Sequence, residues 1–131
     1  MAGFSDYLEN ELLDHLFGKG VYPPPELYVA LSTADPGDDG ADLAEPSGGS
    51  YARVATSSVD WTAAADGVIC NADALQYPEA AAPWGTITHF ALLDAQAGGH
   101  LLAHGPLAAP QGVALGDIVR FAPGDLSVTL N

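Results

Sequence analysis

The sequence predicts a mainly β protein: an antiparallel β-sandwich of jelly-roll-like form with one amphipathic α-helix at its amino terminus. Apolar residues recur at helical spacing only near the amino terminus, and short apolar segments bounded by Gly, Pro, Asp or Asn follow, as is typical of a sandwich or barrel. The chain lacks the crossover helices that a parallel sheet needs. We expect residues 1–20 to hold the helix and residues 21–131 to form a single β-sandwich domain.

The helix is predicted between Ser5 and Phe17, with Ser5 as its N-cap and Gly18 as its stop. Its apolar residues are spaced three and four apart, so they form one stripe. Such a stripe packs either on the sandwich of the same chain or on a neighbouring subunit, and both alternatives are open. For the second alternative, the predicted partner-docking residues are Phe4, Leu8, Leu12, Leu13, Leu16 and Phe17.

The strands follow a proline-rich connector at residues 23–25, which excludes further helix. Leu27–Thr33 alternates like a half-buried strand, with Leu27, Val29 and Leu31 on one face and Tyr28, Ala30 and Ser32 on the other. Residues 34–50 predict a loop, and Asp94–Gly99 a hairpin loop whose glycines supply positive φ. Further strands are predicted at Tyr51–Ser57, Gly67–Asn71, Thr86–Asp94, Leu101–Pro106, Ile118–Phe121 and Leu126–Leu130.

The charge of the chain excludes several classes of partner. Three basic residues, Lys19, Arg53 and Arg120, stand against seventeen carboxylates, and the net charge is −14. Such a surface repels phosphate, so we expect no direct binding of nucleic acid. No apolar run reaches the roughly 20 residues that a membrane-spanning helix needs, and no secretory signal is visible, so we expect synthesis in the cytoplasm.

Candidate sites for chemistry are few. The sequence contains no nucleophile elbow, phosphate-binding loop or zinc-protease motif, so we predict no catalytic or cofactor-binding residues and no enzyme. Cys70 is the only cysteine and reads as a buried or bystander thiol. We interpret the four histidines as hydrogen-bonded structural residues, because none of them has a cluster of partner ligands in the sequence. His100 and His104 would lie roughly 13 Å apart in a strand, which is too far for the two to share a metal ion.

An acidic loop allows two interpretations. It carries Asp35, Asp38, Asp39, Asp42 and Glu45, and carboxylates of this kind bind calcium. The EF-hand pattern fails, because Gly37 and Pro46 occupy positions that should supply ligands. A solvated acidic loop at residues 35–45 is therefore favoured over a calcium site, and no metal ligands or cofactors are assigned.

Aromatic residues near segment ends also allow two interpretations. Exposed rings could stack on a sugar or anchor a partner chain, whereas buried rings would simply mark the edge of the core. These residues are Tyr22, Tyr28, Tyr51, Trp61, Tyr77 and Trp84. For Arg53 we predict a structural ion pair: a buried side chain that contacts a carboxylate or a backbone carbonyl.

Four segments together resemble one family of proteins. They are Phe4–His15, Leu27–Pro36, Glu45–Val54 and Trp84–Asp94, including the phrases Tyr-Ala-Arg-Val and Trp-Gly-Thr-Ile-Thr-His-Phe. In the same order they resemble small tailed-phage and prophage proteins that are commonly labelled tail fibre proteins, some of them related to head-spike or decoration components of phages and gene transfer agents. The resemblance implies a β-rich structural protein of the virion that assembles into symmetric oligomers.

We therefore expect a non-enzymatic component of the exterior of a phage or phage-like particle. Its partners would be capsid or tail subunits and further copies of the chain, with a closed trimer or pentamer matching the symmetry axes of the particle. The alternatives are a carbohydrate-binding module for a host surface glycan and, from another class, a small hydrolase.

Overall fold

The computed structural model describes residues 2–130, and its elements follow a short strand, a helix and then strands in chain order. The strands are β1 (Gly3–Phe4), β2 (Leu27–Ser32), β3 (Val54–Thr56), β4 (Val68–Cys70), β5 (Leu75–Gln76), β6 (Gly85–Leu93), β7 (Leu101–Val113), β8 (Arg120–Phe121) and β9 (Ser127–Thr129). The helices are α1 (Asp6–Leu16) and the 3-10 turn η1 (Ser58–Asp60). Every predicted strand overlaps an observed one, whereas β1, β5 and η1 are too short to leave a pattern in the sequence.

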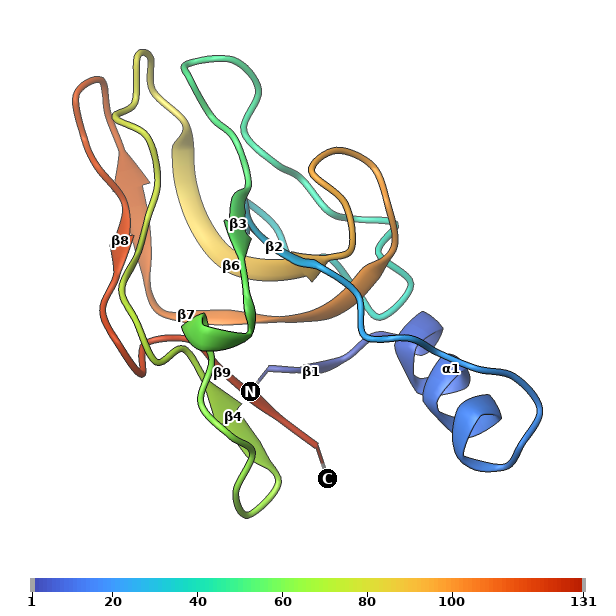
Figure 1. Cartoon of the computed structure of the whole chain (residues 1–131). Coiled ribbons are helices and arrows are strands. Elements are labelled where there is room, and N and C mark those ends of the chain that lie inside the picture. The colour runs from blue at the N-terminus through green and yellow to red at the C-terminus, as the bar shows by residue number, and fades with distance from the viewer. Residues whose placement is uncertain (1, 131) are drawn as a thin grey trace.

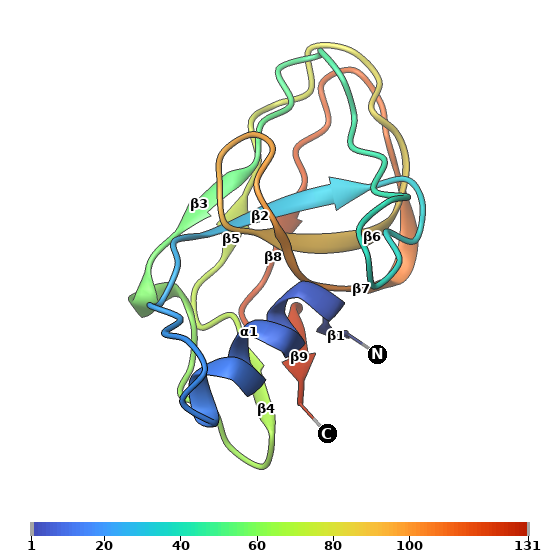
Figure 2. The ribbon, with the colours of Figure 1, turned by 90° about the vertical axis from the view of Figure 1, so that its right-hand side faces the viewer.

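Five strands form the main antiparallel sheet, in the order β1-β7-β6-β2-β3. Two two-stranded ribbons, β4 with β9 and β5 with β8, complete the β structure, and Figures 1 and 2 show the strongly bent β6 and β7 at its centre. The predicted antiparallel β-sandwich with one helix is confirmed. The jelly-roll-like connection stays a prediction, as do the two domain limits, whose ends at residues 1 and 131 lie outside the described residues.

Helix α1 begins where the sequence predicts. The Ser5 hydroxyl accepts a hydrogen bond from the backbone N–H of Leu8 at 3.2 Å and donates one to the carbonyl of Leu101, so the cap also joins the helix to β7. Gly18 follows the helix with a φ of 77°, which a residue with a side chain rarely adopts. Both helix limits were therefore readable from local chemistry.

The main core lies between one face of the sheet and the two ribbons. Val29 and Leu31 of β2 are fully buried there, and the side chains of Tyr77, Trp84 and Phe121 pack edge to face beside them. The Tyr77 hydroxyl donates a hydrogen bond to the carbonyl of Val29 at 2.7 Å. This core holds the sheet and ribbons together, and the hydroxyl of its buried Tyr77 is paired.

The second face of the sheet is covered as well, which corrects the prediction that β2 is half-buried. Ala30 and Ser32 are completely buried, so β2 is not half exposed. Residues 33–50 cross this face: Leu43 packs on a small cluster that includes Ala30, and the Ser32 hydroxyl accepts a hydrogen bond from the N–H of Ala44 at 3.1 Å. The loop packs through Leu43 and the buried Pro36. Its carboxylates Asp35, Asp38, Asp39 and Asp42 are exposed, in line with the predicted solvated acidic loop.

Strand β7 is longer than predicted. It continues past Pro106 and Pro110 to Val113, although proline usually ends a strand. Its pairing with β1 stops at His104, so beyond that residue β7 pairs with no strand of the described chain on its β1 side. Proline is tolerated on such an edge because no ladder hydrogen bond is lost.

Candidate functional site

The apolar stripe of α1 is divided in two. Leu8 is 8% exposed and Leu12 is half-buried, and both pack toward the sheet. Leu16 and Phe17, by contrast, are 76% and 70% exposed. The helix therefore packs within its own chain through its first half only, while its second half projects apolar side chains outward.

The exposed residues of this second half continue into the connector. We define the helix–connector face as Leu13, Leu16, Phe17 and Val21, all of which are more than half exposed. Single exposed apolar residues are ordinary, but four within nine residues of one chain segment form a patch of the kind that marks an interaction site. Figure 2 shows α1 and the connector at the same end of the molecule as β4 and β9.

Backbone hydrogen bonds hold the connector against the helix. The N–H of Lys19 donates to the carbonyl of Asp14 at 2.7 Å, and the N–H of Tyr22 donates to Nδ1 of His15 at 3.1 Å. His15 is thus a structural histidine here. The helix–connector face is preformed, so a partner would meet it with little loss of conformational entropy.

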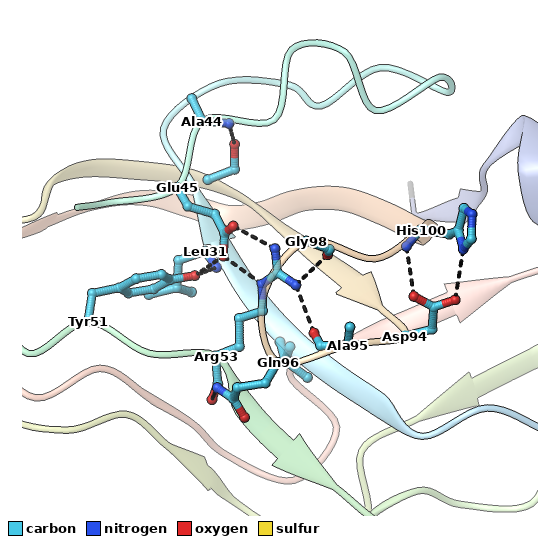
Figure 3. A network of polar contacts seen from close by, with 12 residues as sticks. Leu31, Ala44, Glu45, Tyr51, Arg53, Asp94, Ala95, Gln96, Gly98 and His100 are labelled. Atoms are coloured by element: carbon cyan, nitrogen blue, oxygen red, sulfur yellow. Dashed lines mark hydrogen bonds and ion pairs between the residues drawn. The ribbon is translucent and has the colours of Figure 1, made fainter. Parts of the chain in front are cut away.

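Arg53 anchors a second polar region, the Arg53 network, shown in Figure 3. It is 8% exposed and lies in a fork with Glu45, whose two carboxylate oxygens accept from Nε at 2.9 Å and from Nη2 at 2.8 Å. Nη1 donates to the carbonyls of Ala95 at 2.7 Å and Gly98 at 2.8 Å. This is the buried, paired environment that the sequence predicts for Arg53, and it fixes the β6–β7 hairpin loop to the segment before β3.

Tyr51 completes the Arg53 network. Its hydroxyl donates to Glu45 at 2.6 Å and accepts from the N–H of Leu31 at 3.0 Å. Burial alone would raise the pKa of the Glu45 carboxyl, but the hydrogen bonds from Arg53 and Tyr51 outweigh it and hold this pKa below its ordinary value. Burial and the hydrogen bond to Glu45 raise the pKa of Tyr51.

The hairpin loop also contacts the helix. Asp94 accepts hydrogen bonds from the backbone N–H of His100 at 2.7 Å and pairs with its ring at 3.1 Å, and the ring of Tyr7 stacks on His100 with 4.0 Å between centroids. Burial raises the pKa of the Asp94 carboxyl, but the hydrogen bonds from His100 lower it by more. The pKa of Asp94 therefore lies below its ordinary value. Gly98 and Gly99 have positive φ, as the hairpin prediction requires.

The acidic loop uses its carboxylates internally. Asp35 and Asp39 accept hydrogen bonds from backbone N–H groups two residues later, and Asp38 contacts Nε2 of His104 at 2.9 Å. Asp35 lies 3.6 Å from Nδ1 on the other side of the same ring, so the two carboxylates do not converge. Between residues 2 and 130 no three such side chains gather closely enough to hold a metal ion. The expectation that this loop holds no metal or cofactor stays a prediction.

Three of the six aromatic residues cannot serve as exposed stacking platforms. Tyr77 and Trp84 are 1% and 4% exposed, and Tyr51 packs against both. The core interpretation is therefore right for these three. Neither the Tyr7–His100 stack nor the exposed Val21 has a signal in the sequence. The stack depends on how α1 packs against the β6–β7 hairpin, and the exposure of Val21 depends on the path of the connector.

Comparison with known proteins identifies one family. The family model described as "Podophage GP4 fiber I protein gp80" matches residues 3–129, which is nearly the whole chain. No curated protein matches the chain. Within residues 2–130 no helix is both long and apolar enough to cross a membrane.

Proposed function

The chain belongs to the family described as Podophage GP4 fiber I protein gp80, and from this premise we propose that it is a non-enzymatic structural component of the virion exterior. The observation that supports this role best is the helix–connector face, which leaves large apolar side chains exposed on a preformed surface. We propose that this face docks the chain onto tail or capsid subunits. The opposite end of the molecule would then point away from the particle.

The charge of the chain favours a basic partner. Each copy carries a net charge of −14, and Arg53 is buried in its own network, so Lys19 and Arg120 are the exposed basic side chains of the described chain. Copies in free solution repel one another, and a basic virion surface attracts them. We therefore propose that a closed ring, a trimer or a pentamer, forms on the particle rather than before docking.

The experiment replaces the exposed apolar residues in a phage that encodes the chain. In the double variant Leu16→Ser/Phe17→Ser, we expect the number of copies per purified virion to fall roughly tenfold or more, because each lost apolar contact weakens docking. Leu115→Ser is the matched control, since Leu115 is 68% exposed and belongs to the turn between β7 and β8. Figure 1 shows that this turn lies at the end of the molecule away from α1. Quantitative mass spectrometry of virions counts the copies.

Two results would contradict the proposal. If both variants are incorporated like the unmodified chain, the helix–connector face does not dock. If a reconstruction of the virion contains no density for the chain on its exterior, the structural role itself is wrong. Circular dichroism of both purified variants checks that they remain folded.

Binding of a host surface glycan is the second candidate function. Fewer aromatic side chains can contact a sugar than the sequence suggests, because Tyr51, Tyr77 and Trp84 are interior residues. The partly exposed rings of Tyr22, Tyr28 and Trp61 remain as candidate sugar contacts. A glycan array probed with the intact chain tests this role, and saturable binding to one glycan class would support it.

A further inference from the structure

An apolar cleft lies between α1 and the sheet, on the inner side of the helix–connector face. Its volume is about 260 Å³. Leu8 and Leu12 of α1 form one wall, and residues of β1, β2, β4, β6, β7 and β9 form the others. Tyr22 and Pro25 of the connector, Trp61, and Ala103 of β7 are among the other lining residues.

The chemistry of the cleft calls for an apolar occupant. No charged side chain lines it, and the Trp61 indole N–H is already committed to the hydroxyl of Thr56 at 3.0 Å. Water in such a space finds few hydrogen-bond partners, and an empty space forfeits dispersion contacts. Because an engineered apolar cavity of about 150 Å³ holds benzene, this larger cleft has room for a Leu, Met or Phe side chain.

An acidic groove continues outward from the cleft. The two share Tyr22 and Pro25, and the groove, of about 500 Å³, passes between the connector and the helix. Its lining includes three carboxylates, Glu11, Glu26 and Asp94, and no basic side chain. Cationic groups of a partner would therefore be favoured directly beside the apolar cleft.

Tyr22 stands at the junction of cleft and groove with an unused polar atom. Its hydroxyl is buried and makes no hydrogen bond to any of residues 2–130. A buried hydroxyl without a partner is costly, and native structures rarely leave one in that state.

We propose that the cleft and groove together bind a basic segment of a neighbouring virion protein. One large apolar side chain of that segment fills the cleft, and flanking Lys or Arg side chains lie against the groove carboxylates. The inference rests on the proposed docking function and names the chemistry of the partner. A second copy of the chain fits poorly, because the only cation near its exposed Phe17 is Lys19, in a segment that also carries Glu11 and Asp14.

The experiment titrates the intact, isotopically labelled chain with short peptides and follows backbone amide signals by NMR. The probe is acetyl-Lys-Lys-Phe-Lys-Lys-amide. Matched peptides replace Phe with Gly or every Lys with Glu. We expect saturable shifts at Leu12, Tyr22 and Ala103 with the probe, and binding weaker by about tenfold or more with either matched peptide.

Variants of the chain separate the two parts of the site. Leu12→Trp fills the cleft and should remove the preference for Phe over Gly, whereas Glu11→Gln/Glu26→Gln should weaken every Lys-containing peptide. Glu79→Gln is the charge control, because Glu79 is exposed and lies outside both cleft and groove. The unchanged thermal midpoint of each variant shows that it is folded.

The outcomes are distinguishable from those of the docking experiment. If the Phe and Gly peptides bind equally, or if Leu12→Trp leaves that preference intact, the inference is wrong. Shifts at the cleft on self-association, or on addition of a glycan in place of a peptide, would also overturn it. In each case, a reduced number of Leu16→Ser/Phe17→Ser chains per virion would still support the proposed function. If that number were unchanged, both the proposed function and this inference would be wrong.

Discussion

Two regions of the molecule differ in whether their buried polar groups have hydrogen-bond partners. In the Arg53 network, the guanidinium, the Glu45 carboxylate and the Tyr51 hydroxyl all have partners within the chain. Around the helix–connector face, the Tyr22 hydroxyl is buried without one, and a cleft of about 260 Å³ lies beside it. The first region is complete by itself, whereas the second leaves a polar group unpaired and an apolar space unfilled, and the proposed partner would occupy that space.

The contrast separates stability from function. Groups that are satisfied within the chain contribute to folding, and replacing one leaves its partners buried and unpaired. Exposed apolar groups contribute little to the folded monomer, so their replacement should affect association alone. Substitutions in the two regions should therefore have opposite profiles of unfolding and binding.

The largest effect is expected for Arg53→Met. It removes four hydrogen bonds, two to Glu45 and two to the hairpin carbonyls, and leaves a carboxylate partly buried without its cation. Because the Glu45 side chain is 22% exposed, we expect a loss near the lower end of the range for broken buried pairs, about 3 kcal/mol. Urea unfolding measures it. Arg53→Lys is the control and should recover only part, since Lys lacks the planar fork.

A loss below 1 kcal/mol for Arg53→Met would mean that the network contributes little to stability, and the contrast between the two regions would fail. If the loss is below 1 kcal/mol and the β6–β7 hairpin loop keeps its position, the loop is held by other contacts, such as the pair between Asp94 and His100.

The next effect is expected for Tyr77→Phe. This tyrosine is 1% exposed and donates a hydrogen bond at 2.7 Å to the carbonyl of Val29, which would lose its partner. We expect a loss of about 1 to 2 kcal/mol in the free energy of unfolding, with the aromatic packing retained. Urea unfolding with the same protocol gives the value, and a change near zero would contradict the assigned hydrogen bond.

A smaller, pH-dependent effect follows from Glu45. Its folded pKa lies below the ordinary value of 4.5, so its pairing stabilises the fold above pH 4.5 and is lost as the pH falls through the folded pKa. In Arg53→Met this stabilisation is missing at neutral pH. The difference in unfolding free energy between wild type and Arg53→Met should therefore shrink between pH 6 and pH 3, in roughly the range of carboxyl titration. A constant difference would show that Glu45 does not titrate with the network.

Local chemistry explains how much of the fold was predictable. The spacing in α1, the Ser5 cap and the glycines of the hairpin loop each act within a few residues, so the sequence alone reveals them. Arg53 was recognisable because the chain has so few cations that a buried one needs a dedicated partner. Its choice of Glu45 depends on the packing of the loop on the sheet, which no local pattern encodes.

The missed features depend on contacts distant in sequence. The stripe of α1 looks uniform, yet the connector and β7 decide that Leu8 is buried and Leu16 is exposed. Pro106 reads as a strand end, but β1 is too short to pair with β7 at that point. Likewise, the burial of Ala30 depends on the loop that crosses it.

The smallest effect is expected for Tyr22→Phe, the same chemical change as Tyr77→Phe in the opposite region. Its hydroxyl is buried without a partner among residues 2–130, so its removal leaves no carbonyl or N–H unsatisfied. We expect the free energy of unfolding to stay within about 0.5 kcal/mol or to rise slightly. Urea unfolding of both variants side by side makes the comparison. A loss as large as that of Tyr77→Phe would show that the Tyr22 hydroxyl is satisfied in the free chain, and the difference between the two regions would then be one of exposure alone.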